Sequence, residues 1–183
     1  MTVTDAELSR VVSHALRHEP WVYELELDQE GWAPVDQLLT SLREKGGDWD
    51  AVDRDALERM VTTGAKERHE LHGDRIRALY GHSVPGRIQL QPAIPPTRLF
   101  HGTAPQTWAA IRAGGLLPMQ RQFVHLSMDR ETALMVGRRK TFSPVLLVVD
   151  ASAAAGAGTA FYRGSELVWL TDSVPARFID TAE

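Results

Sequence analysis

The sequence contains no cysteine, which excludes disulfide bonds and thiolate chemistry and fits a cytoplasmic protein. Long hydrophobic runs are also missing, because the longest, Val145–Val149, is far too short to span a bilayer. The N-terminal residues lack the apolar stretch of a signal peptide. No G-x-G-x-x-G pattern follows a strand and no metal ligands cluster, so we expect neither a Rossmann fold nor a metal site.

The 183 residues carry a net charge of −4, which argues against a general nucleic-acid-binding surface. The charge is unevenly distributed along the chain. Residues 1–92 hold 11 Lys and Arg against 17 Asp and Glu, a net of −6, whereas residues 93–183 hold 9 against 7, a net of +2. Any contact with RNA must therefore come from a local cluster of basic residues.

A Pro-rich stretch, Gln91–Thr97, divides the chain into lobes at residues 1–92 and 93–183. In the first lobe, hydrophobic periodicity predicts three helices followed by a β-hairpin. The helices are expected from a Thr4 capping box to Pro20, from Pro34 to Gly46 and after Asp53, and the strands at Arg68–Leu71 and Arg75–Leu79. Three helices and a hairpin follow the order of a winged-helix module.

The second lobe is richer in strands. Strands are expected at Arg98–His101, Val124–Ser127, Pro144–Asp150 and Leu167–Leu170, and helices at Gln106–Ala113 and Asp129–Arg139. The Ala- and Gly-rich stretch Ala151–Ala160 is expected to be a loop. Because the regular βαβ rhythm is missing, the sequence predicts an α+β fold.

Two motifs of the first lobe have both a functional and a structural interpretation. Arg17 and His18 combine a planar donor suited to phosphate with a group that titrates near neutral pH. Cations at a helix C-terminus also complement the helix dipole, and these residues alone favour that explanation. Arg75 and Arg77 share one face of the hairpin and would bind a phosphate or form weak ion pairs, of which ion pairs are favoured.

The strand ending in His101, Gly102 and Thr103 would expose a ring nitrogen, a hydroxyl and a glycine that a ligand can approach closely. The alternative is a plain turn. On the next predicted strand, Phe123, His125 and Ser127 share a face that would line a nucleotide pocket, unless His125 belongs to the core.

The run from Arg138 to Lys140 ends a predicted helix and would meet a phosphate of RNA or of a dinucleotide, or would complement the helix dipole. Further along, Trp169 is expected to pack in the core.

Taken together, these motifs resemble those of one family. From about Leu8 to Ile179 the chain carries, in order, L-R-H-x-P, K-x-R, I-R-A-x-x-G-H-S, H-G-T, R-x-x-V-H-L-S, V-G-x-R and V-W-L-T. This order is similar to that of the RNA 2′-phosphotransferase (KptA) family.

The resemblance implies an N-terminal winged-helix, RNA-binding lobe and a C-terminal ADP-ribosyltransferase-like lobe of mixed α/β structure that binds NAD. It implies that an internal RNA 2′-phosphate attacks the anomeric carbon of the nicotinamide ribose and expels nicotinamide. The ribose O2″ then attacks the phosphorus, which gives 2′-OH RNA and ADP-ribose 1″,2″-cyclic phosphate. NAD is a co-substrate, no metal is implied, and the RNA is tRNA-like, as in tRNA splicing or RNA repair. We expect a monomer without membrane contacts.

The resemblance also assigns residues. The catalytic tetrad falls on Arg17, His18, Arg68 and Arg121. The arginines would clamp the 2′-phosphate, and His18 would serve the second step as an acid–base group. NAD would be held by His101, Gly102, Thr103, His125 and Ser127, with a further phosphate contact from Arg138 or Arg139.

The chain departs from the usual family pattern at Ala65, His69, Tyr80 and Leu167, where the family has an acidic residue, an aromatic, Gln and Gly. None of these positions belongs to the tetrad. Two other functions share these motifs: an ADP-ribosyltransferase that caps terminal phosphates of RNA or DNA, and a non-catalytic NAD- or RNA-sensing winged-helix protein. His18 favours the phosphotransferase over the first, and the complete tetrad favours it over the second.

Overall fold

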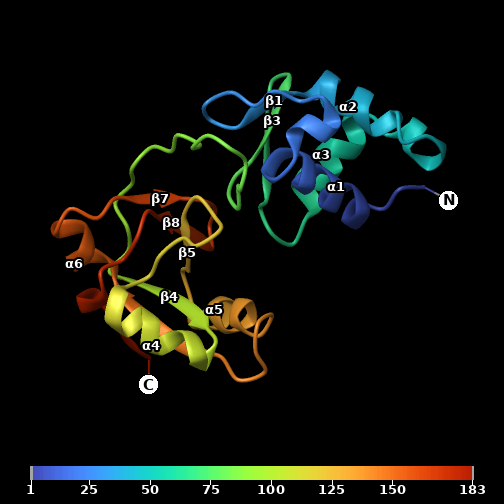
Figure 1. The fold of residues 1–183 in the computed structure, drawn as a ribbon. Helices are drawn as coiled ribbons and strands as arrows, with labels where there is room; N and C mark the ends of the chain where they lie inside the picture. Colours follow the sequence, from blue (N-terminus) through green and yellow to red (C-terminus); the bar gives the residue numbers. More distant parts are fainter. Residues whose placement is uncertain (1, 183) are drawn as a thin grey trace. The chain divides into compact units, whose positions relative to one another are not determined.

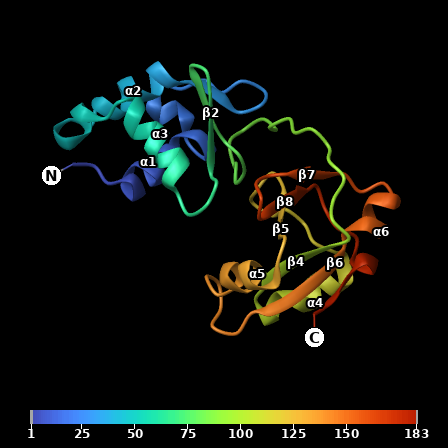
Figure 2. The same cartoon turned by 180° about the vertical axis from the view of Figure 1, so that it is seen from behind.

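The computed structural model describes residues 2–182. The chain forms two compact units, Met1–Gln89 (unit 1) and Leu90–Glu183 (unit 2), so the division falls just before the Pro-rich stretch. Figures 1 and 2 show both units from opposite sides. Within the described residues there are six α-helices and two antiparallel sheets, which confirms the α+β class.

Unit 1 contains three α-helices and a three-stranded sheet. Its elements are α1 (Asp5–Arg17), β1 (Trp32–Pro34), α2 (Val35–Arg43), α3 (Arg54–Thr63), β2 (His69–His72) and β3 (Arg75–Ala78), with short 3₁₀ turns at Pro20–Tyr23 and Gly47–Ala51. The strand order is β1-β3-β2, so the predicted hairpin gains a third strand on the side of β3. β1 escaped prediction because three residues carry no readable alternation.

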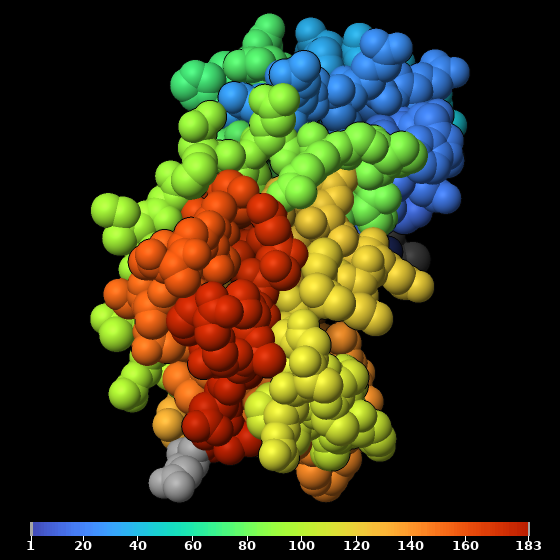
Figure 3. Space-filling model, turned by 60° about the vertical axis from the view of Figure 1, so that its left-hand side comes forward, coloured from blue at the N-terminus to red at the C-terminus, as the bar shows by residue number. Residues whose placement is uncertain are grey.

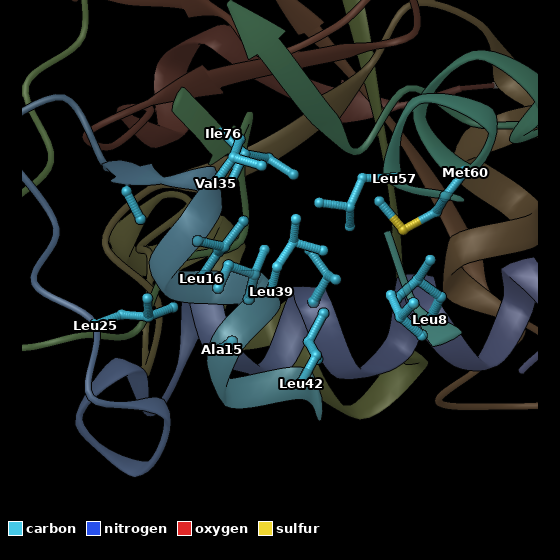
Figure 4. Close-up of a cluster of buried hydrophobic side chains, with 14 of the residues drawn as sticks. Leu8, Ala15, Leu16, Leu25, Val35, Leu39, Leu42, Leu57, Met60 and Ile76 are labelled. Atoms are coloured by element: carbon cyan, nitrogen blue, oxygen red, sulfur yellow. The ribbon is translucent and has the colours of Figure 1, made fainter. Parts of the chain in front are cut away.

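The helices of unit 1 form because each has an apolar face and a defined start. At the start of α1 the side chain of Thr4 accepts from the Glu7 N–H while the Glu7 carboxylate accepts from the Thr4 N–H, as a capping box requires. The apolar faces of the three helices meet the buried face of β3 in one core. Figure 4 shows the side chains that point into it, among them Leu8, Leu16, Leu39, Leu57 and Ile76.

Unit 2 is built on a six-stranded sheet of order β7-β8-β5-β4-β6-β9, in which every pair is antiparallel. The strands are β4 (Arg98–Thr103), β5 (Val124–Ser127), β6 (Val145–Asp150), β7 (Phe161–Arg163), β8 (Val168–Thr171) and β9 (Ile179–Thr181). The helices are α4 (Pro105–Gly114), α5 (Arg130–Gly137) and α6 (Ala151–Gly156), followed by a 3₁₀ turn at Ala176–Phe178. The predicted strands and helices are present, and Trp169 is buried as expected.

One prediction for unit 2 was wrong: the stretch Ala151–Ala160 does not form only a loop, because its first six residues form α6. The Asp150 side chain caps this helix by accepting from the Ala153 N–H at 2.9 Å. Ala151 and Ala154 are buried against the sheet, and alanine has the highest helix propensity of all residues. The helix was not predicted because the Ala- and Gly-rich composition of the stretch is also typical of a loop.

Along residues 2–182, every helix is too short or too polar to cross a membrane.

Candidate active site

Unit 1 brings three of the four tetrad residues together where α1 ends. Arg17 is the last residue of α1, and its guanidinium Nη2 donates to the main-chain carbonyl of Arg68, 51 positions along the chain, at 3.4 Å. The same guanidinium lies 5.1 Å from the centre of the Tyr80 ring in a cation–π contact. Arg17 is half-buried and His18 is exposed, so the cluster opens to solvent at the imidazole.

A segment to which the sequence motifs gave no role, Tyr80–Ser83, packs against this helix end. The Ser83 N–H donates to the Arg17 carbonyl at 2.8 Å, and the Ser83 hydroxyl lies 2.8 Å from Nδ1 of His18. Gly81 has φ +88°, and a methyl group there would touch Cδ of Arg17 at 3.5 Å. The available signal was the G-H-S in the motif I-R-A-x-x-G-H-S, which places a glycine next to two polar residues.

Two buried histidines line the same region. Nε2 of His69 lies 3.0 Å from the Ser13 hydroxyl, and burial together with the charges of Arg17 and Arg68 lowers the pKa of His69 to about 3. Burial, followed by the charges of Arg17, His18 and Arg77, lowers the pKa of His82 to about 4. Within residues 2–182, Nε2 of His82 is buried without a hydrogen-bond partner. Both imidazoles are therefore neutral at pH 7.

This neutrality predicts that acidification destabilises unit 1. In the unfolded chain each imidazole takes up a proton near its ordinary pKa of 6.5, whereas in the folded unit it stays neutral down to about pH 3 or 4. The unfolded state thus binds more protons below pH 6.5, and the unfolding free energy falls by up to about 1.4 kcal/mol per pH unit for each group. Urea unfolding at several pH values between about 7 and 5 measures this slope.

The matched substitutions are His82→Gln, which removes one buried imidazole, and His72→Gln at the exposed end of β2. We expect His82→Gln to reduce the pH slope and His72→Gln to leave it unchanged. An identical slope in both variants would contradict the assignment.

Arg68 also borders a pocket of about 290 Å³ in unit 1. The pocket lies between the start of α1 and the end of α3, and Lys66 and His69 share its wall. The K-x-R motif therefore places two cations beside a hollow. Arg68 itself is half-buried.

The hairpin arginines, Arg75 and Arg77, form the ion pairs that the sequence analysis favoured. Arg77 forms an ion pair with Glu70 at 2.7 Å, and Arg75 forms one with Asp28 at 3.3 Å. Both guanidinium groups also lie over the Trp32 ring, at 5.2 Å for Arg75 and 4.4 Å for Arg77. Their charges are compensated by carboxylates of unit 1, so they are poor candidates for a phosphate site.

In unit 2, two histidines on neighbouring strands present the same side of their rings to the backbone. Nδ1 of His101 donates to the His125 carbonyl at 2.9 Å, and Nδ1 of His125 donates to the Phe123 carbonyl at 3.0 Å. Burial lowers the pKa of His101, and the charge of Lys140 adds to this effect. In the neutral His101 ring Nε2 is then the hydrogen-bond acceptor, and in His125 the contact with Phe123 likewise leaves Nε2 as the nitrogen that faces away from this carbonyl.

Gly102 corrects the physical reason given for the H-G-T motif. The sequence suggested that this glycine lets a ligand approach, but it is buried under α5 instead. A methyl group at Gly102 would lie 2.1 Å from the Ala133 carbonyl oxygen, and the Gly102 and Gly137 backbones are in direct contact. The glycine is required because β4 and α5 pack backbone to backbone. Thr103 is buried as well, not exposed as the motif suggested.

The remaining candidates of unit 2 lie at its surface or beside the two histidines. Ser127 is buried and pairs with Phe100 across β4 and β5. Arg121 is exposed in the turn before β5, and Figure 3 shows this yellow segment at the surface. Arg138 and Arg139 are exposed just after α5. Unit 1 thus joins Arg17, His18 and Arg68, and Arg121 belongs to unit 2.

Side chains that could bind a metal do not gather anywhere in the described part of the chain: no group of three or more His, Asp or Glu is placed to hold an ion.

Comparison with known proteins agrees with the motifs. The family model described as RNA 2′-phosphotransferase, Tpt1/KptA family, matches residues 3–173. The chain is 48% identical over 174 residues to a probable RNA 2′-phosphotransferase of Acetivibrio thermocellus, with 95% of each chain covered. It is 48% identical to a relative of the same name from Bacillus thuringiensis, covering 94% of this chain and 92% of the relative. A third, from Streptomyces griseus, is 42% identical over 182 residues and 94% of each chain.

These matches place the chain among the transferases. It belongs to the RNA 2′-phosphotransferase, Tpt1/KptA family, which confirms the resemblance stated from the motifs.

Proposed function

We propose that this protein transfers an internal RNA 2′-phosphate to NAD and returns RNA with a free 2′-hydroxyl. The supporting observation is the cluster at the end of α1, where Arg17, the neighbour of His18, meets Arg68 although 51 positions separate the two arginines. The lobe predicted at residues 1–92 would be the winged-helix RNA lobe, because the helices and the sheet order β1-β3-β2 of unit 1 fit that module. The lobe predicted at residues 93–183 would be the ADP-ribosyltransferase-like NAD lobe. The protein would act as a cytoplasmic monomer.

The residues of the cluster suit the two stages of such a transfer. Guanidinium groups offer forked donors that match phosphate oxygens, so Arg17 and Arg68, with Arg121 of unit 2, would bind the RNA 2′-phosphate. In the first stage a phosphate oxygen bonds to the anomeric carbon of NAD, and nicotinamide leaves. In the second stage the ribose O2″ bonds to phosphorus and the RNA 2′-oxygen leaves with a proton. His18 would move that proton.

The histidines of unit 2 fit the sugar of NAD. A ribose offers hydroxyl donors, and the neutral His101 ring has Nε2 as its acceptor; in His125, Nδ1 is also engaged by a backbone carbonyl, so Nε2 is the nitrogen left to meet the ribose. Gly102 would act indirectly, by holding β4 close to α5, and Thr103 and Ser127 lie in the same strands. Arg138 or Arg139 would add a contact to a phosphate of the RNA.

The deciding experiment supplies the purified protein with NAD and an RNA oligonucleotide that carries one internal 2′-phosphate. We expect nicotinamide, ADP-ribose 1″,2″-cyclic phosphate and RNA with a 2′-hydroxyl at that position. A parallel reaction contains an oligonucleotide with a terminal phosphate only. A folded protein that modifies only the second oligonucleotide would be a capping ADP-ribosyltransferase, and one that consumes no NAD would be a binding protein.

A further inference from the structure

We infer that Ser83 is a positioning residue that fixes the ring of His18 for proton transfer; this inference rests on the proposed function. The hydroxyl of Ser83 lies 2.8 Å from Nδ1 of His18. His18 is exposed and is the cap residue that follows the last residue of α1, so its backbone alone does not fix its ring. The contact with Ser83 therefore restrains the orientation of the imidazole.

The serine is itself firmly held. Its N–H donates to the Arg17 carbonyl at 2.8 Å, one of the carbonyl groups that the end of α1 leaves without a helical partner. Gly81, two residues earlier, lies against the Arg17 side chain, and His82 between them is buried. One short segment thus caps the helix and orients the histidine that follows it.

A hydroxyl suits a histidine that changes its protonation state. It donates to Nδ1 when that nitrogen is bare and accepts when Nδ1 carries a proton, so the contact survives either way. When it donates, the proton of the neutral ring sits on Nε2, which leaves Nε2–H as the group offered to a substrate. A carboxylate in this place would instead keep Nδ1 permanently protonated.

The test compares Ser83→Ala with Ser83→Thr, which keeps the hydroxyl. Nitrogen-15 NMR of the His18 ring reports the tautomer without any substrate, and we expect Ser83→Ala to shift the tautomer ratio and Ser83→Thr to restore it. We also expect Ser83→Ala to slow release of 2′-OH RNA from the ADP-ribosylated RNA about 3- to 10-fold, the worth of one hydrogen bond. The pH profile of this step should change with it.

Ser13→Ala provides the control, because Ser13 forms another serine–histidine contact in unit 1, with His69 at 3.0 Å. It should leave the His18 ring signals unchanged. Wild-type His18 signals in Ser83→Ala would overturn the inference. If Ser83→Ala shifts the tautomer but the wild-type protein transfers no phosphate, the proposed function is contradicted and the orienting role of Ser83 still stands.

A different observation supports a second proposal: the basic turn, residues 138–142, binds a single-stranded segment of the RNA beside the NAD site. Arg138, Arg139 and Lys140 are all exposed, and Phe142 is 98% exposed. Residues 132–149 contain no acidic side chain. Within residues 2–182, the three cations form no ion pair, in contrast to the compensated arginines of the hairpin. This proposal also rests on the proposed function.

The turn is ordered and lies near the NAD-site histidines. The Lys140 and Thr141 N–H groups donate to the Gly137 carbonyl, at 3.0 and 3.3 Å, so the turn continues the end of α5. Gly137 contacts Gly102 of β4, and the charge of Lys140 helps to lower the pKa of His101. Figures 1 and 2 show the orange loop after α5 projecting from unit 2.

The chemistry of the turn favours RNA over NAD alone. Several adjacent cations match a row of phosphates, whereas the dinucleotide has a single pyrophosphate. A fully exposed phenyl ring is unfavourable in water, and an unpaired base stacks on such a ring regardless of sequence. A strand bound here would pass close to the site where its 2′-phosphate must react.

Fluorescence anisotropy with a labelled single-stranded RNA carrying one internal 2′-phosphate tests this proposal. We expect Phe142→Ala to weaken RNA binding about 5-fold or more, and Phe142→Trp to retain it. Replacing Arg138 and Lys140 together by Ala should reduce the slope of log K against log[salt] by about 1.4. NAD affinity, measured separately by calorimetry, should not change in these variants.

Arg112→Ala is the matched control, because Arg112 is an exposed cation in the last turn of α4 of the same unit. It should preserve RNA affinity and the salt slope. Unchanged RNA binding in the variants of the turn, or a loss of NAD affinity, would overturn the proposal. A wild-type protein that binds RNA through the turn but transfers no phosphate would contradict only the proposed function.

Discussion

His18→Ala should convert NAD and 2′-phosphorylated RNA into nicotinamide and an ADP-ribosylated RNA that accumulates. The first bond needs only a phosphate oxygen that is already negative and a nicotinamide that leaves without a proton. The second needs a proton to leave O2″ and another to reach the RNA 2′-oxygen. Loss of the acid–base group should slow this second stage about 10²- to 10⁴-fold. Gel separation of the labelled RNA species over time measures both stages.

His14→Ala is the matched control for this experiment. His14 lies one turn earlier on α1, its ring centre is 6.1 Å from that of His18, and it contacts Tyr23 at 3.2 Å and Glu19 at 3.1 Å. This variant should pass through both stages at the wild-type rate. If His18→Ala also completes both stages normally, His18 does not transfer the proton.

Gly102→Ala should destabilise unit 2 and abolish NAD binding. The new methyl group would sit 2.1 Å from the Ala133 carbonyl oxygen, and the obstacle is helix backbone that cannot rotate away. Separating α5 from β4 would displace His101 and Thr103, the neighbours of Gly102. We expect a loss of about 3 kcal/mol in the free energy of unfolding, at the upper end of overpacking effects. Urea unfolding and calorimetric titration with NAD measure the two losses.

Gly114→Ala controls for the general effect of replacing a glycine. Gly114 is the last residue of α4, and a methyl group there meets no atom within 4 Å. Because alanine is the better helix former, this variant should be as stable as the wild type or slightly more stable. Wild-type stability in Gly102→Ala would show that the contact with α5 is not tight.

Local signals were sufficient to predict the helices of unit 1. The Thr4 capping box and the apolar spacing of α1 depend only on residues within a few turns; they placed its start correctly, and its predicted end at Pro20 lies three residues beyond the observed last residue, Arg17. β1 depends instead on a distant partner: Trp32 and Pro34 are extended because they pair with Arg77 and Arg75. No pattern within three residues reveals such a pairing.

The candidate site shows the same limit. Arg17, His18 and Arg68 could be selected from the order of motifs, but that order did not reveal that Arg17 donates to the Arg68 carbonyl or that Ser83 meets His18. Gly102 was correctly recognised as a point of close approach, yet the approaching partner was assigned as a ligand and is α5. Residue types indicate what a position can do, whereas its partner is decided by packing.

The end of α1 has a consequence for protein synthesis. Arg17 and His18 form hydrogen bonds with residues 51 and 65 positions downstream, so the cluster proposed to bind phosphate requires Arg68 and Ser83. When only the first helices of a nascent chain have emerged from the ribosome, Arg17 and His18 are present without the groups that orient them. The cluster can therefore assemble only after the whole of unit 1 has emerged, and fragments ending before Ser83 would lack the contact that orients His18.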